Sequence, residues 1–187
     1  YSPDGQAVLS CAGAGTENMP ARDSSLRLWD IQNGNMLQIM QPQVLVNWQC
    51  AISPDGRWAL SGAYDGSVRL WELASGQQIR LLSGHTDWVI SLVFAPDGKK
   101  ALTGSKDGSL IYWDLESGKP IHRLFSAPND NWSLAISPDG RTALSDSAQG
   151  GTIYWDLESG TEIRRLLRVD AMPGASGLAF LPDGHSA

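Results

Sequence analysis

Short apolar stretches, each bounded by a turn-forming cluster, recur along the whole chain. In one unit the apolar stretch 88–94 ends at Ala95-Pro96-Asp97-Gly98, where proline presets φ and glycine admits positive φ. Three more short stretches follow in the same unit, at 100–104, 109–113 and 121–125. All four have the length of strands, and none has helical periodicity or length, so the pattern predicts an all-β chain.

The predicted strands recur with a fixed period. Four tryptophans, each followed by an acidic residue, are spaced by 42 residues: Trp29, Trp71, Trp113 and Trp155. The tripeptide Pro-Asp-Gly begins at Pro3, Pro54, Pro96, Pro138 and Pro182, with intervals of 51, 42, 42 and 44 residues. Four strands in about 42 residues is typical of a β-propeller blade, so the chain is predicted to contain about four blades of antiparallel strands.

Composition restricts the class of ligand. With 14 Lys+Arg against 20 Asp+Glu, the formal net charge of −6 is opposite to the basic surface that phosphate contacts need, so we expect no nucleic-acid partner. The two cysteines, Cys11 and Cys50, are too few for a disulfide framework and are expected to be small buried apolar residues. Without a membrane-length apolar run or a secretory signal, we expect no membrane partner and a cytoplasmic location.

In these repeats the chain resembles the WD-repeat family, whose blades carry Gly-His before the first strand and Trp-Asp at the end of the third. The best-matching unit runs from Gly84-His85-Thr86-Asp87-Trp88-Val89 to Trp113-Asp114, and its motifs are similar to those of bacterial multidomain proteins. The resemblance extends over essentially all of residues 1–187. It implies a single partial propeller whose third strands end at the four repeated tryptophans.

The resemblance also implies a buried hydrogen-bond network, which in the best-matching unit would contain His85, Thr103, Asp107 and Trp113. A buried indole N–H and an imidazole need partners, and a carboxylate in a tight turn can orient the imidazole. One period earlier these positions hold Gln43, Ser61, Asp65 and Trp71, and one period later Ala127, Ser145, Gln149 and Trp155. Only the unit of His85 has the whole set, so stability is expected to be uneven along the chain.

A His and an Asp in one network could instead be a catalytic pair, but the sequence argues against that alternative. The predicted network is buried and ends on a tryptophan, not in a cleft. The chain has no nucleophile elbow and no phosphate-binding glycine loop, and His85, His122 and His185 lack metal-ligand spacing. We therefore expect a protein that is not an enzyme, with no catalytic residues, no metal and no cofactor.

Three other tryptophans are candidates for contact with a partner. Trp88, Trp48 and Trp132 occur where first strands begin, near the face that WD-repeat proteins commonly use for binding, and Asp87 and Asn131 precede two of them. Exposed aromatic side chains at that face would be natural hot spots. Alternatively, each indole fills the gap between neighbouring blades, and the sequence leaves both interpretations open.

Two further expectations concern loops and blade number. The polar, turn-rich segment 12–22 is an insertion between the second and third strands of the first unit, and it either carries recognition or is neutral. The resemblance implies a ring of seven or eight blades. We expect the remaining blades to come from a longer polypeptide or from a second copy of the chain, since open sheet edges invite association.

The expected function is a protein-interaction scaffold or sensor domain, which binds a protein partner of unknown identity through the loops of one propeller face. The alternative is an accessory propeller of a multidomain enzyme whose catalytic domain lies outside this chain. Such propellers often carry Pro-Asp-Gly repeats without Trp-Asp, so the intact Trp-Asp series favours the scaffold.

Overall fold

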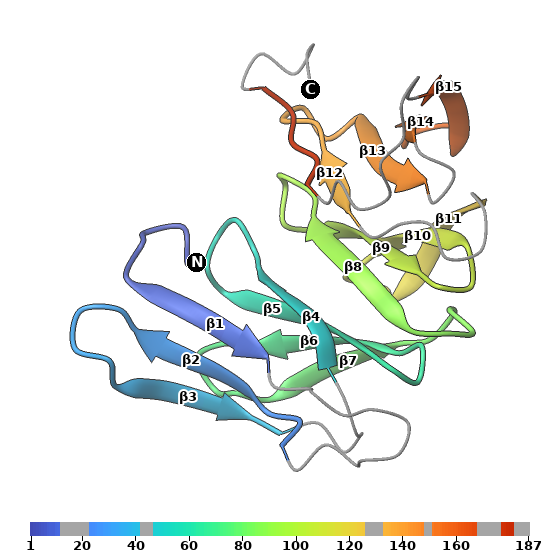
Figure 1. Ribbon diagram of the computed structural model, residues 1–187. Helices are drawn as coiled ribbons and strands as arrows, with labels where there is room; N and C mark the ends of the chain where they lie inside the picture. The colour runs from blue at the N-terminus through green and yellow to red at the C-terminus, as the bar shows by residue number, and fades with distance from the viewer. Residues whose placement is uncertain (12–22, 42–46, 126–132, 148–150, 168–176, 182–187) are drawn as a thin grey trace.

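The computed structural model describes residues 1–11, 23–41, 47–125, 133–147, 151–167 and 177–181. Within these ranges every regular element is a β-strand, and the strands form four antiparallel sheets that follow one another along the chain (Figure 1). The predicted all-β fold of repeated, blade-like sheets is therefore confirmed.

Each sheet is a meander in which strands adjacent in sequence are adjacent in space. The first contains β1 (Ala7–Cys11), β2 (Leu26–Asp30) and β3 (Met36–Met40). The second contains β4 (Asn47–Ile52), β5 (Trp58–Ala63), β6 (Val68–Glu72) and β7 (Gln78–Leu82). The third contains β8 (Val89–Phe94), β9 (Lys100–Ser105), β10 (Ser109–Asp114) and β11 (Lys119–Phe125). The fourth contains β12 (Leu134–Ile136), β13 (Thr142–Ser147), β14 (Gly151–Asp156) and β15 (Thr161–Leu167).

In the second, third and fourth sheets, Pro-Asp-Gly turns close the hairpins between the first and second strands. In the third sheet Gly98 has φ 67° and its amide donates to the carbonyl of Ala95 at 2.9 Å, while Oδ1 of Asp97 accepts the amide of Lys99 at 2.8 Å. A side chain at Gly98 would strain this left-handed backbone. Because the turn chemistry is local, the same hairpin recurs in the second and fourth sheets, where the amides of Gly56 and Gly140 donate to the carbonyls of Ser53 and Ser137.

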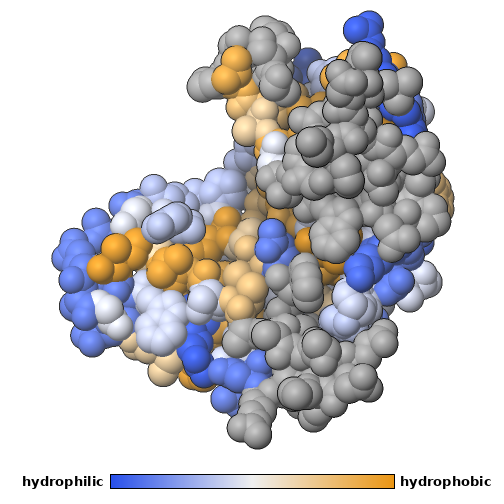
Figure 2. All heavy atoms as spheres, viewed as in Figure 1, coloured by the Kyte–Doolittle hydropathy of each residue, from blue (hydrophilic) through white to orange (hydrophobic). Residues whose placement is uncertain are grey.

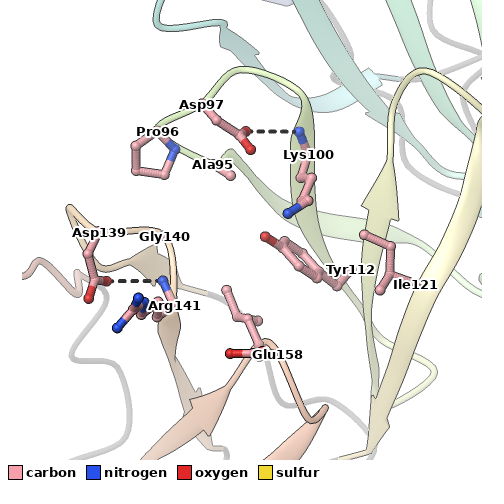
Figure 3. Close-up of a pocket in the computed structure, with 11 residues that line it drawn as sticks. Ala95, Pro96, Asp97, Lys100, Tyr112, Ile121, Asp139, Gly140, Arg141 and Glu158 are labelled. Carbon is pink, nitrogen blue, oxygen red and sulfur yellow. Dashed lines mark hydrogen bonds between the residues drawn. The ribbon is translucent and has the colours of Figure 1, made fainter.

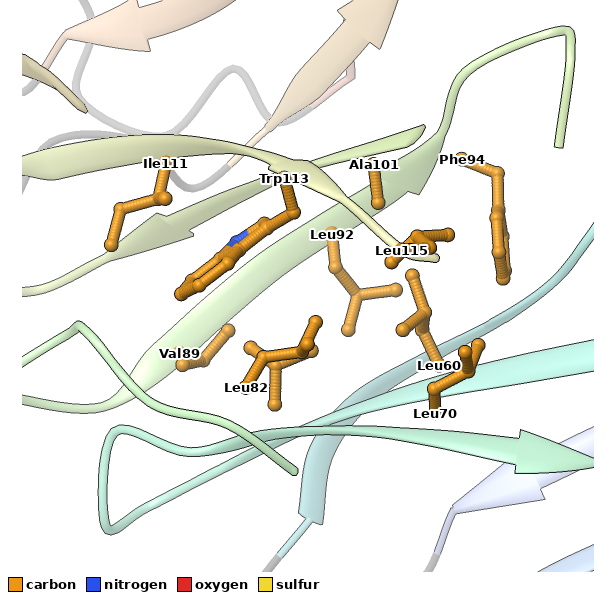
Figure 4. Packing of buried hydrophobic residues seen from close by; sticks show 11 residues of the cluster. Leu60, Leu70, Leu82, Val89, Leu92, Phe94, Ala101, Ile111, Trp113 and Leu115 are labelled. Atoms are coloured by element: carbon orange, nitrogen blue, oxygen red, sulfur yellow. The ribbon is translucent and has the colours of Figure 1, made fainter. Parts of the chain in front are cut away.

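The sheets pack face to face, and each interface contains one apolar cluster. The innermost strands β1, β4, β8 and β12 contact one another in succession. Between the second and third sheets, Leu60, Leu82 and Val89 pack around the buried indole of Trp113 (Figure 4). Side chains that alternate along each strand therefore serve two interfaces, one on each face of the sheet.

The repeated tryptophan of each sheet packs toward the preceding sheet. Trp71, Trp113 and Trp155 are buried in successive interfaces, whereas Trp29 is half-buried on the first sheet, which has no preceding sheet among the described residues. Figure 2 shows hydrophobic residues gathered over β1 and the neighbouring strands, while hydrophilic residues cover the outer edge of the first sheet. The depth of each tryptophan thus depends on the sheet beside it.

At the other end of the chain, residues 177–181 lie against the fourth sheet. The amide of Leu178 donates to Oγ of Ser133 at 3.0 Å, and the ring centroids of Phe180 and Tyr154 are 6.4 Å apart. This segment precedes the fifth Pro-Asp-Gly tripeptide, so it covers the fourth sheet from the side on which a following sheet would pack.

The two cysteines meet at the interface between the first and second sheets. Cys11 on β1 and Cys50 on β4 are free thiols that hydrogen-bond each other, which lowers the pKa of Cys11 and raises that of Cys50. Both pack against the apolar cluster between these sheets, as expected for small apolar residues, but they are half-buried and not buried.

Candidate functional site

One end of the third sheet is built by two segments that hold each other in place. The segment before β8 contains His85, Thr86 and Trp88, and the turn between β9 and β10 contains Lys106 and Asp107. The Thr86 amide donates to Oδ2 of Asp107 at 2.8 Å, and the Lys106 amide donates to the carbonyl of Trp88 at 3.0 Å. These bonds join the two segments into one rigid surface.

Directly beneath this surface, the structure brings His85, Thr103, Asp107 and Trp113 together. The Trp113 indole N–H donates to Oγ1 of Thr103 at 2.8 Å, and Nε2 of His85 lies 2.8 Å from the same oxygen. Nδ1 of His85 lies 3.4 Å from Oδ2 of Asp107. All four side chains are largely or wholly withdrawn from solvent, as a network linking loop to core requires.

A fifth side chain, Ser109, completes the network. Its Oγ lies 2.9 Å from Nδ1 of His85 and donates to Oδ1 of Asp107 at 2.6 Å. This serine was not among the network residues predicted from the sequence. The available signal was the recurrence of an Asp followed two residues later by Ser, at Asp23/Ser25, Asp65/Ser67 and Asp107/Ser109.

A neutral imidazole satisfies every group in the network. Because Ser109 already donates its hydroxyl hydrogen to Asp107, its oxygen accepts from Nδ1 of His85, so Nε2 is the unprotonated nitrogen and accepts the Thr103 hydroxyl. The proton then lies on Nδ1 and is donated toward Ser109 and Asp107. The hydrogen bonds therefore run in one direction, from Trp113 through His85 to the carboxylate.

Burial sets the protonation states of this network. Desolvation lowers the pKa of His85 to about 4, against the opposing effect of the Asp107 carboxylate. Burial alone would raise the pKa of Asp107, but hydrogen bonds from Ser109 and the Thr86 amide outweigh it and hold that pKa below its usual value. At neutral pH the pair consists of a neutral imidazole and a carboxylate.

The first two sheets stabilise the corresponding turn aspartate in another way. Arg69 pairs with Asp65 at 3.5 Å and donates to Oγ of Ser67 at 2.6 Å, and Arg27 pairs with Asp23. Both arginines lie two residues before the repeated tryptophan, a position that holds Ile111 in the third sheet. In these two sheets the described residues show no histidine beside the turn aspartate. An arginine on the same hairpin is therefore the positively charged partner of that aspartate.

Because Arg69 is buried and Asp65 is half-exposed, the two partners should differ in the cost of their removal. Asp65→Ala should lower the free energy of unfolding by about 2 kcal/mol, since it leaves a buried guanidinium unpaired, whereas Arg69→Met leaves a carboxylate that water can reach and should cost less. Urea unfolding of both variants tests this. Equal losses, or a larger loss for Arg69→Met, would contradict the buried-arginine argument.

Above the network, Trp88 forms part of the loop surface. Its half-buried ring lies 3.5 Å from the ring of Tyr64, centroid to centroid, and the Lys106 ammonium lies 3.3 Å from the Trp88 centroid. Tyr64 belongs to the turn between β5 and β6 of the preceding sheet. Trp88 thus bridges two neighbouring sheets and also contributes to the loop surface, which combines the two interpretations that the sequence left open.

Close backbone contact fixes this bridge. A Cβ at Gly66, where φ is +79°, would lie 2.7 Å from the carbonyl oxygen of His85, so only glycine allows the two turns to meet. Asp87 is exposed beside Trp88 and accepts the Trp88 amide at 2.7 Å. The surface therefore has an aromatic centre with a cation and a carboxylate on either side.

The remaining predicted contacts lie outside the described side chains. Trp132, Asn131 and the insertion 12–22 fall in segments that the structure does not describe, as do Gln43, Ala127, Gln149 and His185. Trp48 is a backbone member of β4, but its side chain is not described. The structure therefore brings together the four predicted network residues and, beside them, Trp88 and Asp87.

Among the described residues, no group of three or more His, Cys, Asp or Glu side chains is arranged to hold a metal ion. In the same parts of the chain, no helix is long and apolar enough to cross a membrane.

Comparison with known families gives one match. The family model described as WD domain, G-beta repeat matches residues 42–72 and 76–114. The first segment contains β4 to β6, and the second contains β7 to β10 with the whole His85 network. No curated protein matches the chain.

Proposed function

We propose that this chain, whose residues 42–72 and 76–114 match the model described as WD domain, G-beta repeat, is a WD-repeat protein and a non-catalytic interaction scaffold whose protein partner binds at the loop surface of Trp88. Repeats of this family generally mediate interactions between proteins, and they are typically non-catalytic. The partner is proposed to contact Trp88 and Tyr64, with Asp87 and Lys106 at the margin.

The observation that carries this proposal is the half-buried Trp88 ring between Tyr64 and Lys106. Large aromatic side chains held in one orientation lose little conformational entropy on binding, and they dominate the energy of many interfaces. The hydrogen bonds between the segment of Thr86 and the turn of Asp107 supply that rigidity. The network beneath therefore has a positioning role and not a chemical one.

Trp88→Ala is expected to reduce recovery of a specific protein partner about thirty-fold or more, the loss expected for an interface hot spot. The measurement is quantitative affinity capture at low temperature from cells that produce the protein, comparing wild type and variant. The control is Ile163→Ala, which truncates an exposed side chain on the outer strand β15 and should leave recovery unchanged.

The outcome that opposes the proposal is equally clear. If Trp88→Ala and wild type recover the same proteins in the same amounts, the loop surface around Trp88 is not the partner site. Circular dichroism of both variants at the capture temperature shows whether any loss reflects unfolding.

A further inference from the structure

A cavity of about 470 Å³ opens between the third and fourth sheets (Figure 3). Its walls come from the hairpin turns that follow β8 and β12 and from the strands behind them, including Lys100, Tyr112, Ile121 and Leu157. Trp88 precedes β8, whereas these turns follow β8, so the cavity lies at the opposite end of the sheet from the proposed partner surface. Its volume is within the range of ligand-binding pockets.

A comparison of the repeats shows which side chain fills the equivalent space between the second and third sheets. In the second sheet Trp58 opposes Glu72, and one period later Lys100 opposes Asp114, so Lys100 has the place of Trp58. Trp58 packs against the cluster that contains Leu70 and Leu115. One period later these two leucines correspond to Tyr112 and Leu157, which line the cavity.

The correspondence extends to the turns. The cavity wall contains Asp139, Gly140 and Arg141, which follow Asp97, Gly98 and Lys99 by one period. The same position of the repeat therefore holds an indole between the second and third sheets. Between the third and fourth sheets it holds a lysine, and the cavity lies there.

The walls carry groups that complement an aromatic ring with an N–H. Ile121 and Leu157 are apolar, the Lys100 ammonium lies 5.9 Å from the centroid of the Tyr112 ring, and Arg141 and Glu158 lie on the opposite side of the opening (Figure 3). Around Trp58 the chain already uses a cation in this way, because the guanidinium of Arg57 lies 5.5 Å from the Trp58 ring. Cations stabilise indole faces, and a carboxylate can accept an indole N–H.

The hydroxyl of the buried Tyr112 side chain is a further polar group at the cavity. Desolvation and the nearby Asp97 carboxylate raise the pKa of Tyr112 to about 12, and its hydroxyl, like that of any tyrosine at neutral pH, is a hydrogen-bond donor. Leu70 at the corresponding place in the second sheet has no such group. The cavity thus combines apolar walls with donors and an acceptor at its rim.

We propose that this cavity binds an indole side chain presented by a partner polypeptide, in the place that Trp58 fills one repeat earlier. The partner's aromatic ring lies between Lys100 and the apolar wall of Ile121 and Leu157, and its N–H faces Glu158. This second contact site is separate from the loop surface of Trp88.

The test uses 5-fluoroindole as the probe, observed by fluorine NMR in titrations with the whole chain. The wild type should broaden and shift the probe signal. Lys100→Trp should abolish the effect, because it places within the cavity the side chain that the previous repeat has, and it should raise the melting temperature. The matched control is Thr142→Trp, which adds the same side chain one period later, outside the residues that line the cavity, and should retain binding.

Amide chemical shifts of the wild type locate the probe without any variant. Shifts confined to residues 95–100 and 139–141 support the proposal, and shifts at 84–88 instead overturn it. It is also overturned if the wild type leaves the probe signal unchanged, if Lys100→Trp binds as well as wild type, or if Thr142→Trp loses binding to the same extent. None of these results alters the outcome of the Trp88 experiment, so the two sites are tested independently.

Discussion

Thr103→Val should lower the free energy of unfolding by about 2–4 kcal/mol, because a single hydroxyl serves two buried partners and each orphaned group costs about 1–3 kcal/mol. Oγ1 of Thr103 accepts the indole N–H of Trp113 and donates to Nε2 of His85. Valine has nearly the same shape, so the loss reflects hydrogen bonding and not a cavity.

The second sheet offers a control for this prediction, because the equivalent hydroxyl there makes only one of the two hydrogen bonds among the described side chains. Ser61 occupies the same position one period earlier, and its hydroxyl accepts only the indole N–H of Trp71, at 3.0 Å, among the described side chains. Ser61→Ala should therefore cost about half as much as Thr103→Val. Urea unfolding at neutral pH measures both values. Equal losses would mean that the His85 contact adds nothing to stability.

The stability of the chain should fall by about 3 kcal/mol between pH 6.5 and pH 4 through His85 alone. The sign follows from the pKa, which is 6.5 for an imidazole in water and about 4 in the fold. Between these values the unfolded chain binds a proton that the folded chain does not, so acid favours unfolding. The stabilisation is complete above pH 6.5 and is lost as the pH falls toward 4.

His85→Gln isolates this contribution, because glutamine is the residue that the previous repeat has at Gln43 and it does not titrate. The difference in unfolding free energy between wild type and variant, measured in urea at several pH values, should shrink from pH 7 to pH 4. A difference that is independent of pH would refute the assignment of a buried neutral imidazole. The Asp107 carboxylate, whose pKa is held below its usual value, should contribute only at lower pH.

The same variant separates a structural role from a catalytic one. If the network only stabilises the fold, and the Thr86–Asp107 bond is enough to hold the loops at low temperature, His85→Gln should lower the melting temperature and leave partner capture at low temperature nearly unchanged. Loss of an activity at unchanged melting temperature would instead assign chemistry to His85.

Local signals in the sequence were sufficient for the hairpins. Thr103 and Trp113 are ten residues apart and belong to paired strands β9 and β10, so their contact follows from the turn between them. The Asp65–Arg69 pair is also local, but it was missed because the family pattern directed attention to a histidine that this unit lacks. Ser109 was missed because its partner His85 lies 24 residues away, across a whole hairpin.

By itself, the sequence determined the all-β class, the period of 42 residues and the turn chemistry, since strand alternation and tight turns depend on neighbours within a few residues. The four residues of the network were implied by the resemblance to the WD-repeat family. Only the tertiary structure decided how the sheets face one another. It set the half-exposure of Trp29, the contact of Trp88 with Tyr64 and the cavity beside Lys100. These features depend on which side chains meet across two separately folded sheets, and that pairing is a property of packing and not of local sequence.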